Sequence, residues 1–226
     1  MHHRKGKKIL IYFFLLLLVG SINNISLNNL KFEEIKNINV VGLEDSDNTI
    51  LIQNLKDLNF DNIFLINKNK ITNKINSNSL VEKYDVFKRY PSSLDVNIQK
   101  TKFFARINSD GKIFLVGSNG KLSKNNLSNL QLPFIFGKPK IKEFLHFKKI
   151  IDESKFSYNE IKNFYFFSSK RWDLELKNNI IIKLPNDNTN LALNLALEFL
   201  YKEEFKDVKM IDARFENQII LDDRKN

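Results

Sequence analysis

The chain has few side chains that could catalyse a reaction. It contains no cysteine, so disulfides, thiolate metal ligands and cysteine nucleophiles are all excluded. Of its three histidines, His2 and His3 lie at the amino terminus and His146 lies in a lysine-rich segment. No serine or carboxylate pair has a catalytic arrangement, and no glycine-rich phosphate loop or metal-ligand spacing is present. The sequence therefore predicts a non-enzymatic protein without a metal or cofactor.

The chain is basic, but its charge does not indicate nucleic-acid binding. The formal net charge is +10, and Arg4, Lys5, Lys7 and Lys8 contribute to it before the first apolar run. The other lysines are scattered among asparagine and acidic residues, without an RNP-like motif, zinc-finger spacing or helix-turn-helix signature. We therefore expect a solvated basic surface, with neither a nucleic acid nor a small-molecule substrate as partner.

An apolar segment near the amino terminus indicates a membrane. No charged residue occurs from Ile9 to Gly20, and the neutral stretch continues to Leu27, about the length that a bilayer core requires. This predicts a single transmembrane helix over residues 9–27. A cleaved signal peptide is the alternative, because the strongly apolar part is short and small residues follow it. In both cases the basic residues 1–8 should stay in the cytoplasm while the rest crosses the membrane.

The remaining chain is long enough for two small domains, since it has 226 residues of which 42% are hydrophobic. The first domain is predicted to begin with a strand over residues 37–43 and a helix over residues 49–58. A short helix carrying Ile71 and Ile75 should follow, and then two strands over residues 81–89 and 93–100. The predicted order is strand, helix, helix, strand, strand.

The last of these strands has a clear period of two. Leu94, Val96 and Ile98 fall on one face, and polar residues fall on the other. Pro91 can begin this strand without removing a needed backbone donor. The preceding Arg89 and Tyr90 belong either to a binding feature or to a turn that sets the strand register and buries the tyrosine ring, and the turn is favoured.

The second domain should be rich in β-structure. Asp110-Gly111 and Asn119-Gly120 predict consecutive hairpins, and residues 132–139 are expected to form an apolar connection. Amphipathic helices are predicted around residues 141–154 and 191–205, separated by a hairpin that contains Trp172 and turns at Asn178-Asn179. The segment from Val208 to Leu221 closes the domain, so the fold class is α+β.

The motifs in this order resemble the FtsQ/DivIB family of bacterial division proteins. NINVVG, IFLIN followed by a helix, and VFKRYPSSLDVNIQK are similar to its membrane-proximal POTRA domain. The tryptophan hairpin, the later helix and Ile211 to Phe215 are similar to its β domain, where a late strand reads hydrophobic, Asp, hydrophobic, Arg, aromatic. Lys100 to Phe104 depart from the family pattern, which usually has an acidic residue and a proline there.

This resemblance implies a domain plan. The expected parts are a cytoplasmic tail (residues 1–8), a transmembrane anchor (9–27) and a linker (28–36). A POTRA domain of order β-α-α-β-β (37–102), a β-rich domain with one or two flanking helices (103–222) and a tail (223–226) should follow.

The resemblance also implies a function, a location and partners. It predicts a non-enzymatic scaffold of the cell division machinery that recruits FtsB and FtsL homologues and helps to control septal peptidoglycan synthesis. The protein would be a single-pass inner-membrane protein at the division septum, with its carboxy-terminal domains in the periplasm. The alternative is an anchored, POTRA-containing periplasmic protein that serves another envelope assembly or secretion complex.

In this family a partner segment adds as a strand to the terminal sheet edge. The resemblance places this edge at Arg214, Phe215, Glu216, Asn217, Gln218, Ile219, Ile220 and Leu221, with Lys170 and Arg171 as further possible partner contacts. Phe215 could instead be a buried core residue. Arg214 could meet an acidic partner residue or pair with Asp212, and this internal pair is favoured because both lie on one strand face. Trp172 is expected in the core.

Overall fold

The structure is a computed structural model, and it describes residues 3–22, 34–60, 62–124, 131–202, 207–215 and 218–222. Helix α1 (His3–Ile22) contains most of the apolar amino-terminal run, and its side chains from Ile9 to Val19 are exposed. Within the described residues, no helix has the length and apolar character needed to cross a membrane. The structure therefore does not confirm the transmembrane span predicted over residues 9–27, and residues 23–27 lie outside the described part.

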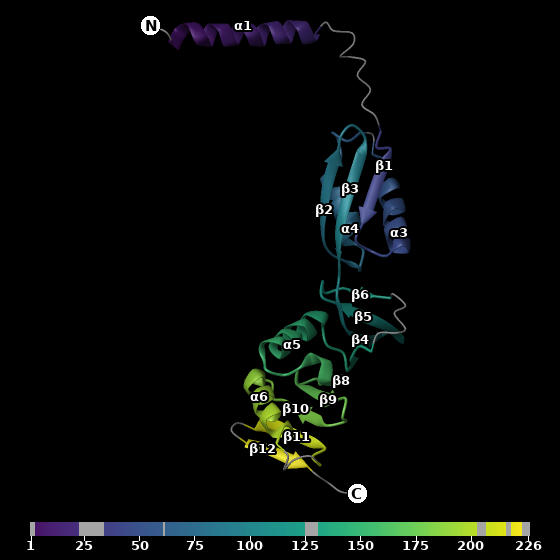
Figure 1. The fold of residues 1–226 in the computed structure, drawn as a ribbon, viewed down its shortest axis with the longest axis vertical. Coiled ribbons are helices and arrows are strands. Elements are labelled where there is room, and N and C mark those ends of the chain that lie inside the picture. Colours follow the sequence, from purple (N-terminus) through teal and green to yellow (C-terminus); the bar gives the residue numbers. More distant parts are fainter. Residues whose placement is uncertain are drawn as a thin grey trace.

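The first domain has the predicted order of elements. Its strands form a sheet of order β1-β3-β2, in which β1 is parallel and β2 antiparallel to the central strand. Helices α3 and α4 lie together against this sheet in Figure 1. The elements are β1 (Asn37–Val41), α3 (Asp45–Lys56), α4 (Lys68–Asn76), β2 (Val81–Arg89) and β3 (Ser93–Lys100).

The alternation in β3 produces the core of this domain. Leu94 and Val96 are fully buried and Ile98 is nearly so, and they pack with Leu51 of α3 and Ile71 of α4. This confirms that one strand face is buried, since a slip by one residue would turn all three side chains into water. The Tyr90-Pro91 bond is cis. The turn itself is as predicted, but the burial of Tyr90 is wrong, because 62% of this residue is exposed.

A hydrogen-bonded junction joins the two domains. The Glu82 carboxylate accepts hydrogen bonds from the Thr101 hydroxyl at 2.8 Å and from the Ser118 hydroxyl at 2.6 Å. The Asn119 side-chain amide donates to the Ser79 carbonyl at 3.0 Å. Thr101 lies in the segment that departs from the family pattern, and here its buried hydroxyl serves this junction.

The second domain is built on one sheet of nine strands, in the order β12-β11-β10-β9-β8-β7-β4-β5-β6. Figure 1 shows α5 and α6 near each other beside this sheet, and both helices contribute to its buried core. The strands are β4 (Phe103–Ser109), β5 (Lys112–Gly117), β6 (Leu122–Ser123), β7 (Phe134–Phe136), β8 (Ile161–Phe166), β9 (Trp172–Leu176), β10 (Ile181–Lys183), β11 (Met210–Phe215) and β12 (Gln218–Asp222). The helices are α5 (Ile141–Glu153), the short η1 (Tyr158–Glu160) and α6 (Thr189–Leu200).

One expectation for this domain needs correction. Residues 132–139 are not only a connection, because β7 lies within them and pairs in parallel with β4 and with β8, a strand that the patterns did not predict. The late strand predicted at Ile211 to Phe215 is β11, and β12 follows it as an antiparallel partner. The mixed α+β class and the helix over residues 141–154 are as predicted. The helix predicted over residues 191–205 is α6, which ends at Leu200, and residues 203–205 lie outside the described residues.

Trp172 lies in an aromatic core, as predicted. It is 7% exposed, and its ring stacks on Phe147 of α5 with centroids 4.8 Å apart and planes at 3°. Phe144 and Phe164 contact it from α5 and β8. This stacking holds α5 on one face of the sheet.

Candidate partner-binding edge and cationic row

Strand β12 forms one edge of the nine-stranded sheet. It pairs only with β11 among the described strands, in an antiparallel register that joins Ile211 to Leu221 and Asp212 to Ile220. An edge strand presents backbone N–H and C=O groups that a further extended segment can pair with. The resemblance placed a partner site here, and the structure does form an open edge at Gln218 to Leu221.

The backbone direction of individual β12 residues follows from one hydrogen bond. The Lys209 amide donates to the Asp222 carbonyl at 2.9 Å, so Asp222 directs its backbone groups toward β11. Successive residues of a strand direct these groups to opposite edges. Ile219 and Leu221 therefore direct theirs to the free edge, although their side chains pack against the core.

Apolar side chains lie beside this edge. Phe215 is 50% exposed and Ile220 is 47% exposed, so the alternative in which Phe215 is a core residue is wrong. The register shifts between Asp212 and Phe215, which brings Phe215 opposite Gln218. Glu216 and Asn217, the other two predicted edge residues, lie outside the described residues.

Arg214 pairs with Asp212, as the favoured interpretation predicted. Its Nε donates to Asp212 Oδ1 at 2.7 Å, its Nη2 donates to Oδ2, and its backbone amide donates to Oδ1 at 3.1 Å. Burial raises the pKa of Asp212, but these hydrogen bonds and the arginine charge outweigh it, so the pKa is lowered overall. The same bonds raise the pKa of Arg214.

A row of charged residues crosses three neighbouring strands. In the strand register, Lys183 of β10 lies directly opposite both Asp173 of β9 and Asp212 of β11. Directly opposite side chains share one face of a sheet. Since Trp172 packs on the helix side, Asp173 and its row lie on the other face. Both aspartates are only 4% exposed.

The predicted residue Arg171 belongs to this row. Its Nε donates to Asp173 Oδ1 at 3.2 Å, and its guanidinium lies 4.4 Å from the centroid of the Phe167 ring. Burial raises the pKa of Asp173. The charge and hydrogen bond of Arg171, a backbone hydrogen bond from Leu184 and the charge of Lys183 offset this effect only partly. Lys170 precedes it in the exposed β8–β9 turn, where its φ is 63°.

The fold brings Arg171 and Arg214 to the same level of the sheet. Strand β9 runs antiparallel to β10, and β10 runs parallel to β11. Arg171, two residues before Asp173, and Arg214, two residues after Asp212, therefore lie at the same level of the sheet. Two strand spacings separate their strands, which is about 10 Å. The charge of Asp173 also raises the pKa of Arg214. We name Arg171, Asp173, Lys183, Asp212 and Arg214 the cationic row, because three cations there face two carboxylates.

Comparison with known proteins follows the same division into domains. The profile described as "POTRA domain, FtsQ-type" matches residues 34–100, and the one described as "Cell division protein FtsQ/DivIB, C-terminal" matches residues 96–214. The second match alone covers more than half of the chain. The chain belongs to the FtsQ/DivIB family. The resemblance stated from the sequence is therefore confirmed.

Curated relatives carry the same family name. "Cell division protein FtsQ" of Rickettsia bellii is 24% identical over 84% of this chain and 72% of its own length. "Cell division protein DivIB" of Clostridium tetani is 26% identical over 80% of this chain and 73% of its own length. The FtsQ of Bradyrhizobium diazoefficiens is 23% identical over 70% of this chain, which spans about half (48%) of that protein.

A solved structure of the extracytoplasmic domain of DivIB from Geobacillus stearothermophilus is also similar. It matches with 12% identity and a TM-score of 0.31, over 45% of this chain and 98% of that one. The family match ends at Arg214, so Phe215 and β12 lie just beyond it. These positions consequently need a direct binding test.

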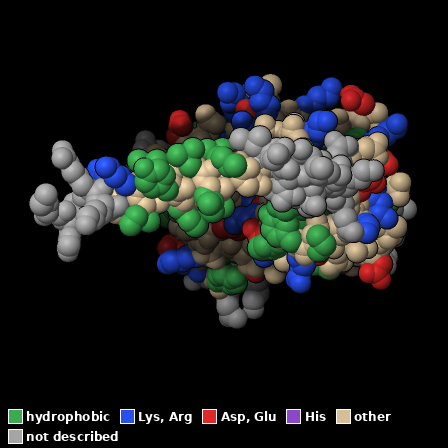
Figure 2. Space-filling view, turned by 90° about the horizontal axis from the view of Figure 1, so that it is seen from above, with side chains coloured by type: hydrophobic (Ala, Val, Ile, Leu, Met, Phe, Trp, Pro, Cys, Tyr) green, Lys and Arg blue, Asp and Glu red, His purple; other side chains and the backbone are tan. Residues whose placement is uncertain are grey.

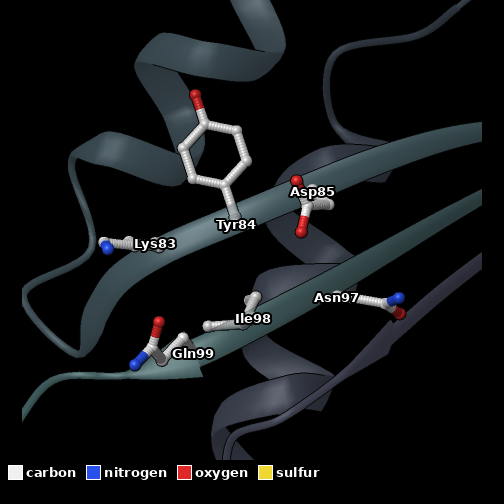
Figure 3. Close-up of a pocket in the computed structure, with 6 residues that line it drawn as sticks. All are labelled: Lys83, Tyr84, Asp85, Asn97, Ile98 and Gln99. Atoms are coloured by element: carbon white, nitrogen blue, oxygen red, sulfur yellow. The ribbon is translucent and has the colours of Figure 1, made fainter.

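Two features outside the β12 edge bear on chemistry, His146 and a hollow in the first domain. The described residues contain no group of three or more His, Cys, Asp or Glu side chains that could hold a metal ion. His146 is exposed on α5. Figure 3 shows a shallow hollow in the first domain, where the Tyr84 ring projects from β2 beside Lys83, Asp85 and residues of β3. It contains no pair of groups arranged for acid–base or nucleophilic catalysis.

Sequence reasoning missed two members of the cationic row, Asp173 and Lys183. The alternation in WDLEL does place Asp173 and Glu175 on the face opposite Trp172. It does not show that Lys183 and Asp212 lie beside Asp173, because that depends on the order and register of β9, β10 and β11.

Proposed function

We propose that this chain is a non-enzymatic, membrane-anchored scaffold of the cell division machinery, and that the β12 edge receives an extended segment of an FtsB-type partner. The observation that carries the proposal is the free edge at Ile219 and Leu221, with Phe215 and Ile220 exposed beside it. Membership of the FtsQ/DivIB family supports the cell division role over service in another envelope complex.

In strand addition the backbone supplies affinity and the side chains supply specificity. The outward N–H and C=O groups of Ile219 and Leu221 would form the ladder with the partner and supply affinity for any extended chain. Phe215 and Ile220 would select apolar partner residues at alternate positions. An exposed aromatic residue of this kind is a common centre of binding energy.

The cationic row would favour a partner segment that carries a negative charge. Arg214 and Arg171 each keep donors that their aspartates do not use, and Arg214 still exposes 34% of its side chain. Three cations against two carboxylates favour an acidic partner residue on the sheet face that the helices leave open. Lys170 in the adjoining turn would add to this attraction.

The membrane location and the septal role are further parts of the proposal. The eleven residues from Ile9 to Val19 form a continuous apolar surface on α1, which favours burial in lipid over exposure to water. The basic residues before it would hold the amino terminus in the cytoplasm and send both domains into the periplasm. Recruitment of FtsB and FtsL there would link the scaffold to septal peptidoglycan synthesis.

Binding of the full chain in detergent to soluble FtsB and FtsL segments from the same genome tests the proposal. Phe215→Ala should weaken binding roughly tenfold, as expected for an anchor residue. Ile219→Pro removes an outward donor and should weaken it by a similar factor, about tenfold. Ile219→Ala keeps that donor and controls for the side chain, and Phe136→Ala, at a residue 43% exposed on another strand, controls for loss of an exposed ring.

Trp172 fluorescence shows whether each variant folds. If the folded wild type binds neither segment, recruitment of these partners is wrong. If the wild type binds and Ile219→Pro binds equally well, the partner uses a surface other than the β12 edge.

A further inference from the structure

Three large apolar side chains are exposed together at one end of the first domain. Phe64 is 53% exposed, Leu65 is 77% exposed and Tyr90 is 62% exposed. The Phe64 and Tyr90 rings lie 5.1 Å apart between centroids, so the segment before α4 and the β2–β3 turn form one patch. Exposed apolar patches mark surfaces that contact proteins or membranes. We name this patch and its basic neighbours the hairpin tip, which consists of Phe64, Leu65, Lys68, Lys88, Arg89 and Tyr90.

The backbone that presents these side chains is held in place. Asn62 is 8% exposed, and its side-chain oxygen accepts hydrogen bonds from the amides of Phe64 at 3.0 Å and Leu65 at 2.9 Å. The neighbouring Ile63 is fully buried. An Asx turn anchored by a buried residue thus directs two apolar side chains outward. Their exposure is a fixed property of the loop.

Two lysines lie within three residues of the patch along the chain, because Lys68 follows Leu65 and Lys88 precedes Tyr90. Lys68 of α4 and Lys88 of β2 line one hollow, together with one acidic residue, Asp85. Among the described residues, neither lysine has an ion-pair partner, whereas Arg89 pairs with Asp95. Aromatic and aliphatic side chains bordered by lysine are typical of surfaces that lie in the headgroup layer of anionic membranes.

The hairpin tip lies where the chain enters the domain from α1. The amides of Lys36 and Asn37 donate to the Ser92 carbonyl in the β2–β3 turn at 2.9 and 3.3 Å. Figure 1 shows that β1 begins at the end of the domain where β2 and β3 are joined, and Figure 2, seen from above, shows the hydrophobic side chains of α1 in a row along the helix. The chain between residues 22 and 34 can span no more than about 40 Å when fully extended. A membrane that holds α1 would therefore be within reach of the tip.

We propose that the hairpin tip contacts the headgroup layer of an anionic bilayer. Leu65 and the two rings enter the layer, and Lys68 and Lys88 face lipid phosphates. The contact fixes the first domain against the membrane, and the hydrogen-bonded junction at Glu82 passes this orientation to the second domain. The inference rests on the membrane location proposed above.

The cysteine-free chain permits a site-specific test. Leu65→Cys in the full chain is labelled with an environment-sensitive fluorophore and reconstituted into phosphatidylcholine vesicles with or without phosphatidylglycerol. Leu191→Cys on α6, at a residue 63% exposed, is the matched control. Flotation of the vesicles reports membrane insertion of the chain independently of the label.

With phosphatidylglycerol, the label at position 65 should shift to the blue and be quenched by doxyl lipids, while the label at position 191 should remain in water. The double change Lys68→Glu and Lys88→Glu should abolish the shift at position 65 without preventing flotation. A glutamate at position 68 lies in the first turn of α4, where a negative charge suits the helix dipole, so the fold should persist.

Each contrary result overturns the inference in a different way. Chains that float while the label at position 65 stays in water show that the tip does not contact lipid, and a protein partner then becomes the better occupant. An equal shift without phosphatidylglycerol removes the role of the lysines and anionic lipid. Failure to float overturns the proposed membrane location together with the tip contact.

Discussion

The two buried aspartates of the cationic row should respond in opposite ways to loss of charge. Asp173 and Asp212 are each 4% exposed and lie in one register row, beside an arginine two residues away. Asp212→Asn should destabilise the protein, whereas Asp173→Asn should be neutral or stabilising. The two changes are chemically identical, so they isolate the effect of the local hydrogen bonds.

The expected magnitudes follow from the contacts. Asp212 accepts from Nε and Nη2 of Arg214 and from its backbone amide, and an asparagine would turn an NH₂ group toward one of these donors. Loss of such charge-assisted bonds costs about 1.5–3 kcal/mol. Asp173 accepts one side-chain bond at 3.2 Å and one from the Leu184 backbone amide, which an asparagine oxygen can also accept, while burial raises its pKa. Its neutral replacement should therefore change stability by about 1 kcal/mol or less, in the favourable direction.

The pH dependence gives the same contrast. The pKa of Asp212 is lowered in the folded state, so its stabilisation is present above the ordinary aspartate pKa and is lost as the pH falls through the lowered value. The pKa of Asp173 is raised, so its charge penalises the fold above that raised value, and the penalty disappears as the pH falls through it. Each substitution removes one of these opposing slopes.

Urea unfolding of the full chain in detergent, followed by fluorescence, measures both effects. Trp172 is the single tryptophan and lies in the core beside the row, so it reports directly on this sheet. The expected order of stability at neutral pH is Asp173→Asn at or above wild type, and Asp212→Asn below it. If Asp173→Asn destabilises as strongly as Asp212→Asn, the argument from hydrogen-bond geometry is refuted.

Three further predictions concern the same fold. Phe147→Ala should lower the free energy of unfolding by about 3–5 kcal/mol, because it leaves a cavity beside Trp172, and urea titration measures this loss. Gly42→Ala should lower the free energy of unfolding by about 1–3 kcal/mol in thermal melts, because the φ of Gly42 is +112° and a Cβ would lie 1.9 Å from a β3 carbonyl oxygen. Gly111→Ala is the control and should lower it less, because Gly111 has φ +76° but lies in open space. Hydrogen bonds lower the pKa of Glu175 to about 2, so the stabilisation by its charge is present above the ordinary pKa of 4.5 and is lost as the pH falls toward 2. Glu175→Gln should therefore flatten the dependence of the unfolding free energy on pH over that range. An unchanged slope would contradict the lowered pKa of Glu175.

Local patterns in the sequence were sufficient for the elements of the first domain. The alternation of Leu94, Val96 and Ile98 predicted a strand with one buried face, and the spacing of Ile71 and Ile75 predicted a helix that packs on it. These predictions succeed because a period of 2 or 3.6 identifies the buried side of a strand or helix without knowledge of its partner.

Exposure at the turns could not be predicted in the same way. Tyr90 is aromatic and follows a strand, which favoured burial, yet 62% of it lies at the surface beside Phe64. Only the structure shows this, because the ring beside Tyr90 is Phe64, which lies 26 residues earlier in the chain and is directed outward by the Asx turn at Asn62. A periodic pattern carries no information about such non-local neighbours.

The sequence by itself determined the family, the α+β class and the chemical character of the late strand with its Asp212–Arg214 pair. Only the tertiary structure decided that β12 lies at a sheet edge, that Phe215 is exposed, and that Arg171 and Arg214 share one level of the sheet. The physical reason is that edge position and register depend on the order in which distant strands pair. That order is set by packing across the whole sheet, not by the residues of any single strand.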